Sequence, residues 1–185
     1  VLGHVISSEG IKVDKAKGDM NIAFQLITPP FDYDLSHSGK GPSDGWFFFS
    51  CYNSEQANTL LEVNASQKDK DFIMAVNWKK IEEYVAKNTG TMMPSKYAHN
   101  VWNESTQSAT SEMLTSTRTI KPEEIPGAIY YIPCPKSPHG VDVDPTGEYF
   151  IGAGKLATII PVFSYSKMIS AIDSKQFDGD VEGIP

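Results

Sequence analysis

The chain has 185 residues, of which 40% are hydrophobic and 21% charged, and its formal net charge is −7. An acidic chain with a single arginine, Arg118, lacks the basic surface that nucleic-acid binding needs, so we expect no nucleic-acid partner. No apolar run approaches the ~18 residues of a membrane span, and two cysteines do not make a disulfide framework. The length suits one domain or part of a larger one, and a chain that begins without Met and ends at Pro185 leads us to expect a fragment.

The first part of the chain predicts strands followed by a loop. Short apolar or alternating runs predict strands at residues 4–6, 11–13 and 21–28. Pro29 and Pro30 end the last of these, because proline cannot donate to a sheet ladder. We expect a loop over residues 29–45, where Asp32, Asp34 and His37 either form a small polar cluster or lie in solvent.

A unit of strand, loop, strand and helix follows. The continuous aromatic run 46–52 predicts a strand that is buried on both faces. A polar loop runs to Asp71, and residues 72–76 predict the next strand. Asn77 is expected to cap a helix over residues 78–87, in which Ile81, Tyr84 and Val85 share one face.

Residues 88–127 predict a long polar excursion that is the least structured part of the chain. Thr, Ser, Asn and Gln dominate there, and residues 97–102 are the one apolar segment. Loops of this length are usually functional or mobile. A strand is expected to follow at residues 128–132.

The last part of the chain repeats the earlier unit. Val141–Asp144 alternates like a half-buried strand, and Asp144-Pro145-Thr146-Gly147 predicts a tight turn. Strands are expected at 148–154 and 158–163, and a helix over 167–172 capped by Ser166. The two copies begin at Gly45 and Gly147, 102 residues apart, a spacing that fits propeller blades of ~40–50 residues if the excursion accounts for the excess. The pattern favours part of an all-β propeller with short capping helices between blades, and a β-sandwich is the alternative.

His139 is the first residue that could carry chemistry. Pro138 favours an extended backbone before it, and Gly140 permits a close backbone approach. A neutral imidazole there would suit copper or zinc, whereas a surface histidine is the simpler interpretation. Cys134, five residues earlier, could pair with it on copper or act as a reactive thiol, but a small buried apolar role is simpler for both Cys134 and Cys51.

A second constellation consists of Tyr52, Glu55 and Asp71, which frame one loop. Two carboxylates together with carbonyl oxygens suit a hard cation such as calcium. The chain has no D-x-D-x-D-G calcium loop, so solvated acidic residues are the alternative.

Three segments together resemble nitrous-oxide reductase, most closely the branch exported through the general secretory route. They are Ala23-Phe24-Gln25, the run from Ser50 to Glu55 that contains Cys-Tyr-Asn-Ser-Glu, and residues 135–156 with their Pro-His-Gly motif. They occur in the family's order and span nearly the whole chain, with residues 88–127 matching least.

The resemblance implies that residues 1–185 are an internal piece of a seven-bladed catalytic β-propeller and that a separate cupredoxin domain is absent from this chain. The family reduces nitrous oxide to dinitrogen at a tetranuclear copper–sulfide cluster held by seven histidines, and the cupredoxin domain carries a dinuclear copper centre. The segments that bear the other six ligands are missing here, so we expect this piece to be inactive alone. A non-catalytic propeller that binds a protein or a small ligand is the alternative.

By the same resemblance, His139 is a ligand of the copper cluster, and Tyr52, Glu55 and Asp71 bind calcium. Ser137 stands where many relatives have an asparagine ligand of calcium, which leaves that contact open. Asp32 or Asp34 matches a carboxylate that orients a cluster histidine. The family further implies a periplasmic homodimer that receives electrons from a small donor protein such as a c-type cytochrome.

Overall fold

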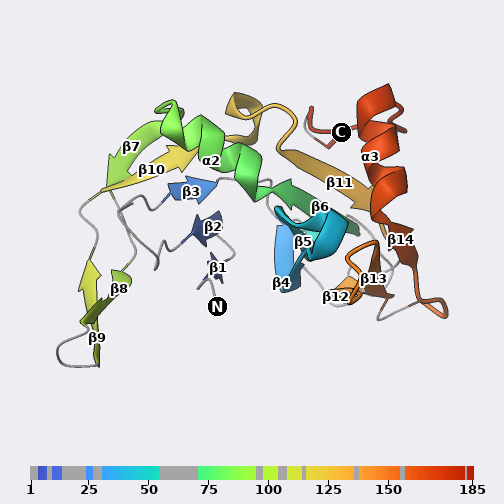
Figure 1. Cartoon of the computed structure of the whole chain (residues 1–185), viewed down its shortest axis with the longest axis horizontal. Helices are drawn as coiled ribbons and strands as arrows, with labels where there is room; N and C mark the ends of the chain where they lie inside the picture. Colours follow the sequence, from blue (N-terminus) through green and yellow to red (C-terminus); the bar gives the residue numbers. More distant parts are fainter. Residues whose placement is uncertain are drawn as a thin grey trace.

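The computed structural model describes residues 4–7, 10–13, 24–26, 31–54, 71–94, 98–103, 108–113, 116–135, 138–154, 157–181 and 183–185. Strands dominate this part of the chain (Figure 1). The first strands are β1 (His4–Ser7), β2 (Gly10–Val13), β3 (Phe24–Leu26), β4 (Phe31–Ser38), β5 (Trp46–Ser54), β6 (Phe72–Asn77) and β7 (Thr91–Pro94). The later strands are β8 (Ala98–Asn103), β9 (Ser108–Met113), β10 (Ser116–Ile120), β11 (Ile129–Pro133), β12 (Pro138–Val143), β13 (Tyr149–Gly154) and β14 (Val162–Ser164). The helices are α2 (Trp78–Ala86), α3 (Tyr165–Ser174) and the short 3₁₀ turns η1 (Gly41–Ser43) and η2 (Pro122–Glu124).

The described strands form four sheets, which confirms the expectation of a β-rich fold. The first sheet has the order β1-β2-β3-β10-β7, the second β11-β6-β5-β4 and the third β12-β13-β14, and β8 and β9 form a separate hairpin. All pairings are antiparallel except that between β10 and β3. The hairpin of β8 and β9 projects from one end of the molecule (Figure 1).

Two segments that were expected to lack regular structure form strands. Residues 31–38, expected in a loop, form β4, because they pair with β5 from Phe31 opposite Ser54 to Ser38 opposite Phe47. The excursion 88–127, expected to have little structure, contributes β7 to β10, and β10 joins the first sheet beside β3. The polar strand β10 depends on a partner distant in sequence, β3, which local periodicity does not reveal. Strand β4 pairs with the neighbouring β5, and its alternation of apolar and polar residues is itself typical of a strand.

The expected repeat is present and is longer than the sequence suggested. The meander β4-β5-β6 is followed by α2, and the meander β12-β13-β14 is followed by α3. The second sheet gains a further strand, β11, which pairs with β6 from Ile129 opposite Val76 to Pro133 opposite Phe72. Strand β14 begins only at Val162, since Pro161 before it has no amide to donate.

The second sheet is buried on both faces, as its aromatic strand predicted. Alternate residues of β5 and β6 enter two different hydrophobic cores. The first core, on the side of α2, contains Phe49, Cys51, Met74, Val76, Ile81, Val85, Ile120, Ile125, Ala128, Ile129 and Tyr131. The second core, between this sheet and the third, contains Trp46, Phe48, Ile73, Ala75, Cys134, Val141, Val143 and Phe150. Neighbouring sheets therefore pack face to face.

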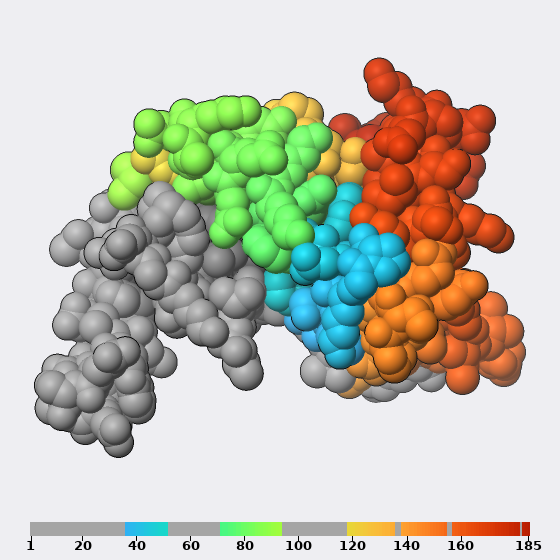
Figure 2. Space-filling model, in the orientation of Figure 1, coloured from blue at the N-terminus to red at the C-terminus, as the bar shows by residue number. Residues whose placement is uncertain are grey.

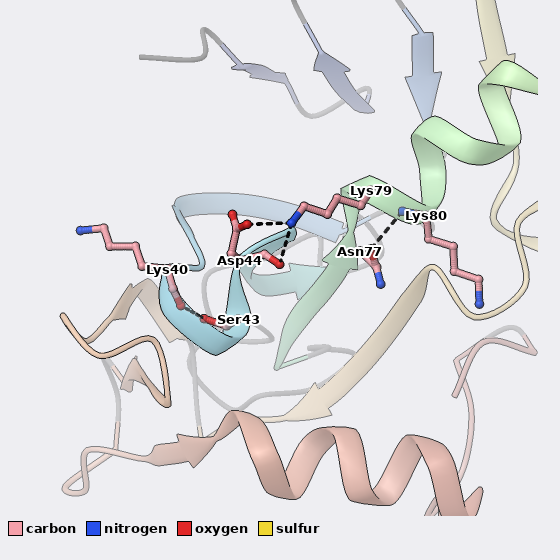
Figure 3. A network of polar contacts seen from close by, with 6 residues as sticks. All are labelled: Lys40, Ser43, Asp44, Asn77, Lys79 and Lys80. Atoms are coloured by element: carbon pink, nitrogen blue, oxygen red, sulfur yellow. Dashed lines mark hydrogen bonds and ion pairs between the residues drawn. The ribbon is translucent and has the colours of Figure 1, made fainter.

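Helix α2 begins as predicted. The Asn77 side chain accepts a hydrogen bond from the Lys80 amide at 3.0 Å, and the Trp78 amide donates to the Gly45 carbonyl at 3.0 Å. Figure 3 shows Lys79 reaching from the first turn to the Asp44 carboxylate, 2.7 Å away. Both of these charged groups are more than half exposed, so the ion pair adds at most about 1 kcal/mol, and the backbone contact and the buried Ile81 fix the helix.

The cap of α3 differs from the prediction. Ser164, and not Ser166, accepts from the Lys167 amide at 3.2 Å. The Ser166 hydroxyl instead donates to Glu148 Oε1 at 2.7 Å, and Ser164 donates to the same oxygen at 2.7 Å. Glu148 thus ties the start of α3 to the turn that precedes β13.

The turns at one end of the two meanders touch backbone to backbone. A Cβ added to Gly147 would collide with the Lys40 carbonyl, and one added to Gly41 would collide with the Thr146 carbonyl. Both glycines have positive φ, 77° and 53°. On the face shown in Figure 2, the cyan surface of residues 36–51 lies between residues 71–94 and residues 138–154. The meanders are therefore fixed to each other at their turns as well as through their core.

Candidate functional site

Several of the sequence-predicted site residues lie at one end of the second sheet. Asp32 of β4 stands opposite Tyr52 of β5. Cys51 stands opposite Phe72, which places Tyr52 beside Asp71 at the start of β6. The Cys134 amide, just after β11, donates to the Asp71 carbonyl at 3.0 Å. Glu55 and Ser137 lie outside the described residues, as do the side chains of Tyr52, Asp32 and Asp34.

His139 lies on β12, at the same end. Gly154 stands opposite Pro138, and a Cβ added to Gly154 would contact Pro135 at 3.7 Å, so the start of β12 follows the Cys134 segment closely. The burial along β12 leaves His139 and Asp142 exposed and buries the residues around them.

A β-bulge shapes the backbone at His139. The pairing of β12 with β13 shifts between Pro138 and Val141. Gly140, inside this bulge, has a backbone φ of 148°, a conformation that residues other than glycine rarely adopt. The bulge turns the His139 segment away from the regular ladder, so that its side chain is on an exposed surface.

Neither cysteine has the properties of a thiolate ligand. Cys51 and Cys134 are both buried and both free. Burial, followed by the negative charge of Asp71, raises the pKa of Cys134 to about 11. Burial likewise raises the pKa of Cys51 far above its ordinary value. Protonated thiols bind metals poorly, which favours the small buried apolar role for both.

His37 is a polar residue whose contacts the sequence did not reveal. Its Nδ1 accepts a hydrogen bond from the Val143 amide at 2.9 Å and lies 3.2 Å from Asp142 Oδ1. A neutral ring with its proton on Nε2 accepts from Val143, whereas a ring donates to Asp142 only when it carries a proton on Nδ1. The amide contact is shorter, and Asp142 is 89% exposed to competing water, so the bond to Val143 dominates for the neutral ring.

The residue types at this end suit two kinds of ion. Tyr52 and Asp71, from adjacent strands, are oxygen donors of the kind that calcium prefers. His139 offers an imidazole, which copper prefers. Among the described residues, no group of three or more histidine, cysteine, aspartate or glutamate side chains is close enough to hold a metal.

A cavity of about 610 Å³ lies between α3, β11, β14 and the segment that follows α3. Aromatic and aliphatic side chains dominate its lining, with Tyr130, Phe163, Met168 and Phe177 among them. None of Tyr52, Asp71 and His139 lines it. Its lining also includes Phe72 and Pro133, next to Asp71 and Cys134, so the cavity reaches this end of the second sheet without including the candidate residues.

Comparison with known proteins finds matches to nitrous-oxide reductases. The nitrous-oxide reductase of Pseudomonas fluorescens is 26% identical over 159 residues, which are 86% of this chain and 22% of that protein. The chain is similar to nitrous-oxide reductases. The enzyme of Stutzerimonas stutzeri is 26% identical over 160 residues, with the same shares of 86% and 22%, and that of Cupriavidus necator is 44% identical over 46 residues, 25% of this chain and 7% of the enzyme.

These identities support a distant relationship at the level of the family. The chain spans about a fifth of the length of the relatives that it matches over most of its own length. No family model matches the chain. In the described part of the chain, no helix is long and apolar enough to cross a membrane.

Proposed function

We propose that this chain is an internal part of the catalytic β-propeller of a nitrous-oxide reductase. The observation that carries the proposal is the 26% identity over 86% of the chain, which includes the segments around Tyr52 and His139. The repeated meanders support the propeller, since consecutive antiparallel meanders that pack face to face are how propeller blades are arranged. In this arrangement β4 and β12 are corresponding strands of neighbouring blades.

His139 would contribute one imidazole to a copper centre. Its exposed position on the bulge of β12 fits a donor that meets ligands from other segments. One histidine cannot hold a copper cluster, so the remaining histidines would come from outside this chain. When bound, the copper centre would supply the two electrons that, with two protons, convert nitrous oxide to dinitrogen and water. This chain would contribute by holding the His139 ring in a fixed position.

Tyr52, Glu55 and Asp71 would bind calcium at the same end. Two contacts support this proposal. The backbones of Tyr52 and Asp71 are neighbours across β5 and β6, and the Cys134 amide donates a hydrogen bond to the Asp71 carbonyl. An ion bound there would fix the loop after β5 near the segment that leads to His139. Asp32, opposite Tyr52, would orient a cluster histidine; Asp34 lies where the register of β4 shifts and is the alternative.

The remaining properties of the family come with the proposal. They are a periplasmic location, a homodimer, a cupredoxin domain with a dinuclear copper centre outside this chain, and electrons delivered by a small protein such as a c-type cytochrome. A non-catalytic propeller that binds a protein or a small ligand is the competing function.

The test uses the intact protein and the variant Glu55→Gln. The wild type is expected to consume nitrous oxide with a reduced dye as donor and to contain both copper and calcium. Glu55→Gln is expected to lower the calcium content and the Tm together, because a carboxylate ligand is replaced by a neutral amide. A wild type that consumes no nitrous oxide and holds no copper would rule out the catalytic function, and unchanged calcium in the variant would remove the calcium site alone.

A further inference from the structure

The strands β4 and β12 lie next to each other without forming a ladder. They belong to different sheets, and in the described part of the chain each is the last strand of its sheet. An edge strand presents backbone amides that have no partner within its own sheet. No backbone ladder of the described sheets therefore joins these two edges.

The amide of Val143 faces the edge of β12 that is not paired with β13. The next amide, of Asp144, donates to the Tyr149 carbonyl at 2.9 Å, across the β12–β13 ladder. Successive amides of a strand point to opposite edges, so that of Val143 points the other way. It is there that His37 Nδ1 accepts the hydrogen bond at 2.9 Å, between residues 106 apart in sequence.

His37 itself is held firmly enough to act on β12. It stands opposite Phe48, which is completely buried in the second core, and its own side chain is 29% exposed. Val143, its partner, is in the same core. The hydrogen bond thus joins a side chain of β4 to the backbone of β12, where both strands are already packed, and fixes how far β12 can slide along β4.

We propose that His37 is a positioning residue that clasps β12 to β4 and so fixes the place of His139. The regular part of β12 begins at Val141, and the bulge with His139 and Gly140 projects from it. Pro138 opposite Gly154 and Val141 opposite Gly152 pair with β13 on either side of the bulge, so the place of the bulge follows how β12 as a whole is anchored. β13 anchors one edge of β12 and His37 the other.

The same bond assigns the nitrogens of His37. The Nδ1 lone pair is used by the Val143 amide, and the neutral ring then carries its proton on Nε2. Neither nitrogen offers a lone pair to a metal in this state. His37 therefore acts on the candidate copper ligand through the backbone and is not itself a ligand. This inference rests on the proposed function for the role of His139, but the clasp between the strands does not.

Two amide variants of His37 separate the clasp from simple polarity. In His37→Asn the side-chain oxygen takes nearly the place of Nδ1, whereas in His37→Gln the same group lies one methylene further out. Asp142→Asn removes the ion pair and leaves the bond to Val143. Hydrogen exchange of the Val143 amide is measured in the intact protein, together with copper retained against a chelator.

We expect the Val143 amide to exchange about fivefold faster than wild type in His37→Gln, because one neutral hydrogen bond is lost. In His37→Asn and Asp142→Asn its exchange rate should stay within about twofold of wild type. Copper retention is expected to weaken about tenfold in His37→Gln and to be restored in His37→Asn, the size typical of residues that orient a metal ligand. Equal exchange in the Asn and Gln variants would overturn the clasp. Faster exchange with unchanged copper retention would overturn the positioning role, and a wild type without copper would refute the proposed function while the exchange data still decide the clasp.

Discussion

The packing of the second sheet on the third can be tested at Phe48. This side chain is completely buried, and its ring stacks on that of Phe150 with centroids 4.2 Å apart and planes 18° apart. Phe150 in turn stacks on Phe163 at 5.1 Å. Replacing a fully buried phenylalanine with alanine removes its transfer free energy and leaves a cavity, which together cost about 3–5 kcal/mol.

The assay is urea unfolding of the intact protein with Phe48→Ala, followed by fluorescence and circular dichroism. Tyr149→Ala is the control, since Tyr149 neighbours Phe150 but is 49% exposed, and it is expected to change the free energy of unfolding by less than about 1 kcal/mol. A double-mutant cycle with Phe150→Ala should show a coupling of about 0.5–1.5 kcal/mol for the stacked pair. If Phe48→Ala costs no more than the control, or if the coupling is absent, the two sheets do not pack as described.

Two further predictions concern the turns. Gly147→Ala is expected to lower the Tm by several degrees, because its φ is 77° and the new Cβ would meet the Lys40 carbonyl; Gly179→Ala, with nothing within 4 Å, is the control, and equal Tm values would refute the contact. The pKa of the Asp144 carboxyl lies below its ordinary value of 3.8, chiefly because Thr146 donates a hydrogen bond to it. The pKa of the Glu148 carboxyl lies below its ordinary value of 4.5, chiefly because Ser164 donates a hydrogen bond to it. Each carboxyl has a lower pKa in the folded protein than in the unfolded chain. Its contribution to stability is therefore complete at pH values above the unfolded pKa and is lost as the pH falls through the folded pKa. The Tm advantage of wild type over a double variant with Asp144→Asn and Glu148→Gln should therefore shrink below about pH 4, and a constant difference would contradict the assignment.

The sequence predicted best where the signal is local or where burial is continuous. The aromatic run of β5 indicated burial on both faces, and the structure divides its residues between two cores. Asn77 and the spacing of Ile81 and Val85 indicated α2, because a cap and one apolar face are properties of a short segment. The correspondence of the two units at Gly45 and Gly147 likewise follows from the order of the elements.

The failures share a different physical cause. The strand β10 is made by its pairing with β3, which is far away in sequence, and the hydrogen bond between His37 and Val143 joins residues 106 apart. Ser166 precedes the apolar helical residues and is of a type that caps helices, but its hydroxyl donates to Glu148, and Ser164 caps the helix instead. At the candidate site, the motifs identified His139, Tyr52 and Asp71, whereas only the strand register shows that their backbones lie at one end. His37 could have been singled out by the alternation of Phe31, Tyr33, Leu35 and His37, which is typical of a strand.

His139 is proposed here as a ligand of a catalytic copper centre. The most direct measurement is the copper content and nitrous oxide reduction of the intact protein with His139→Ala, with His99→Ala on β8 as the control and circular dichroism to show that both variants fold. Ligands of one centre act as a unit, so His139→Ala should lose copper and reduce activity by orders of magnitude, while the control keeps both. If copper and activity both survive in His139→Ala, His139 is an ordinary surface histidine and the proposed function of this segment is wrong.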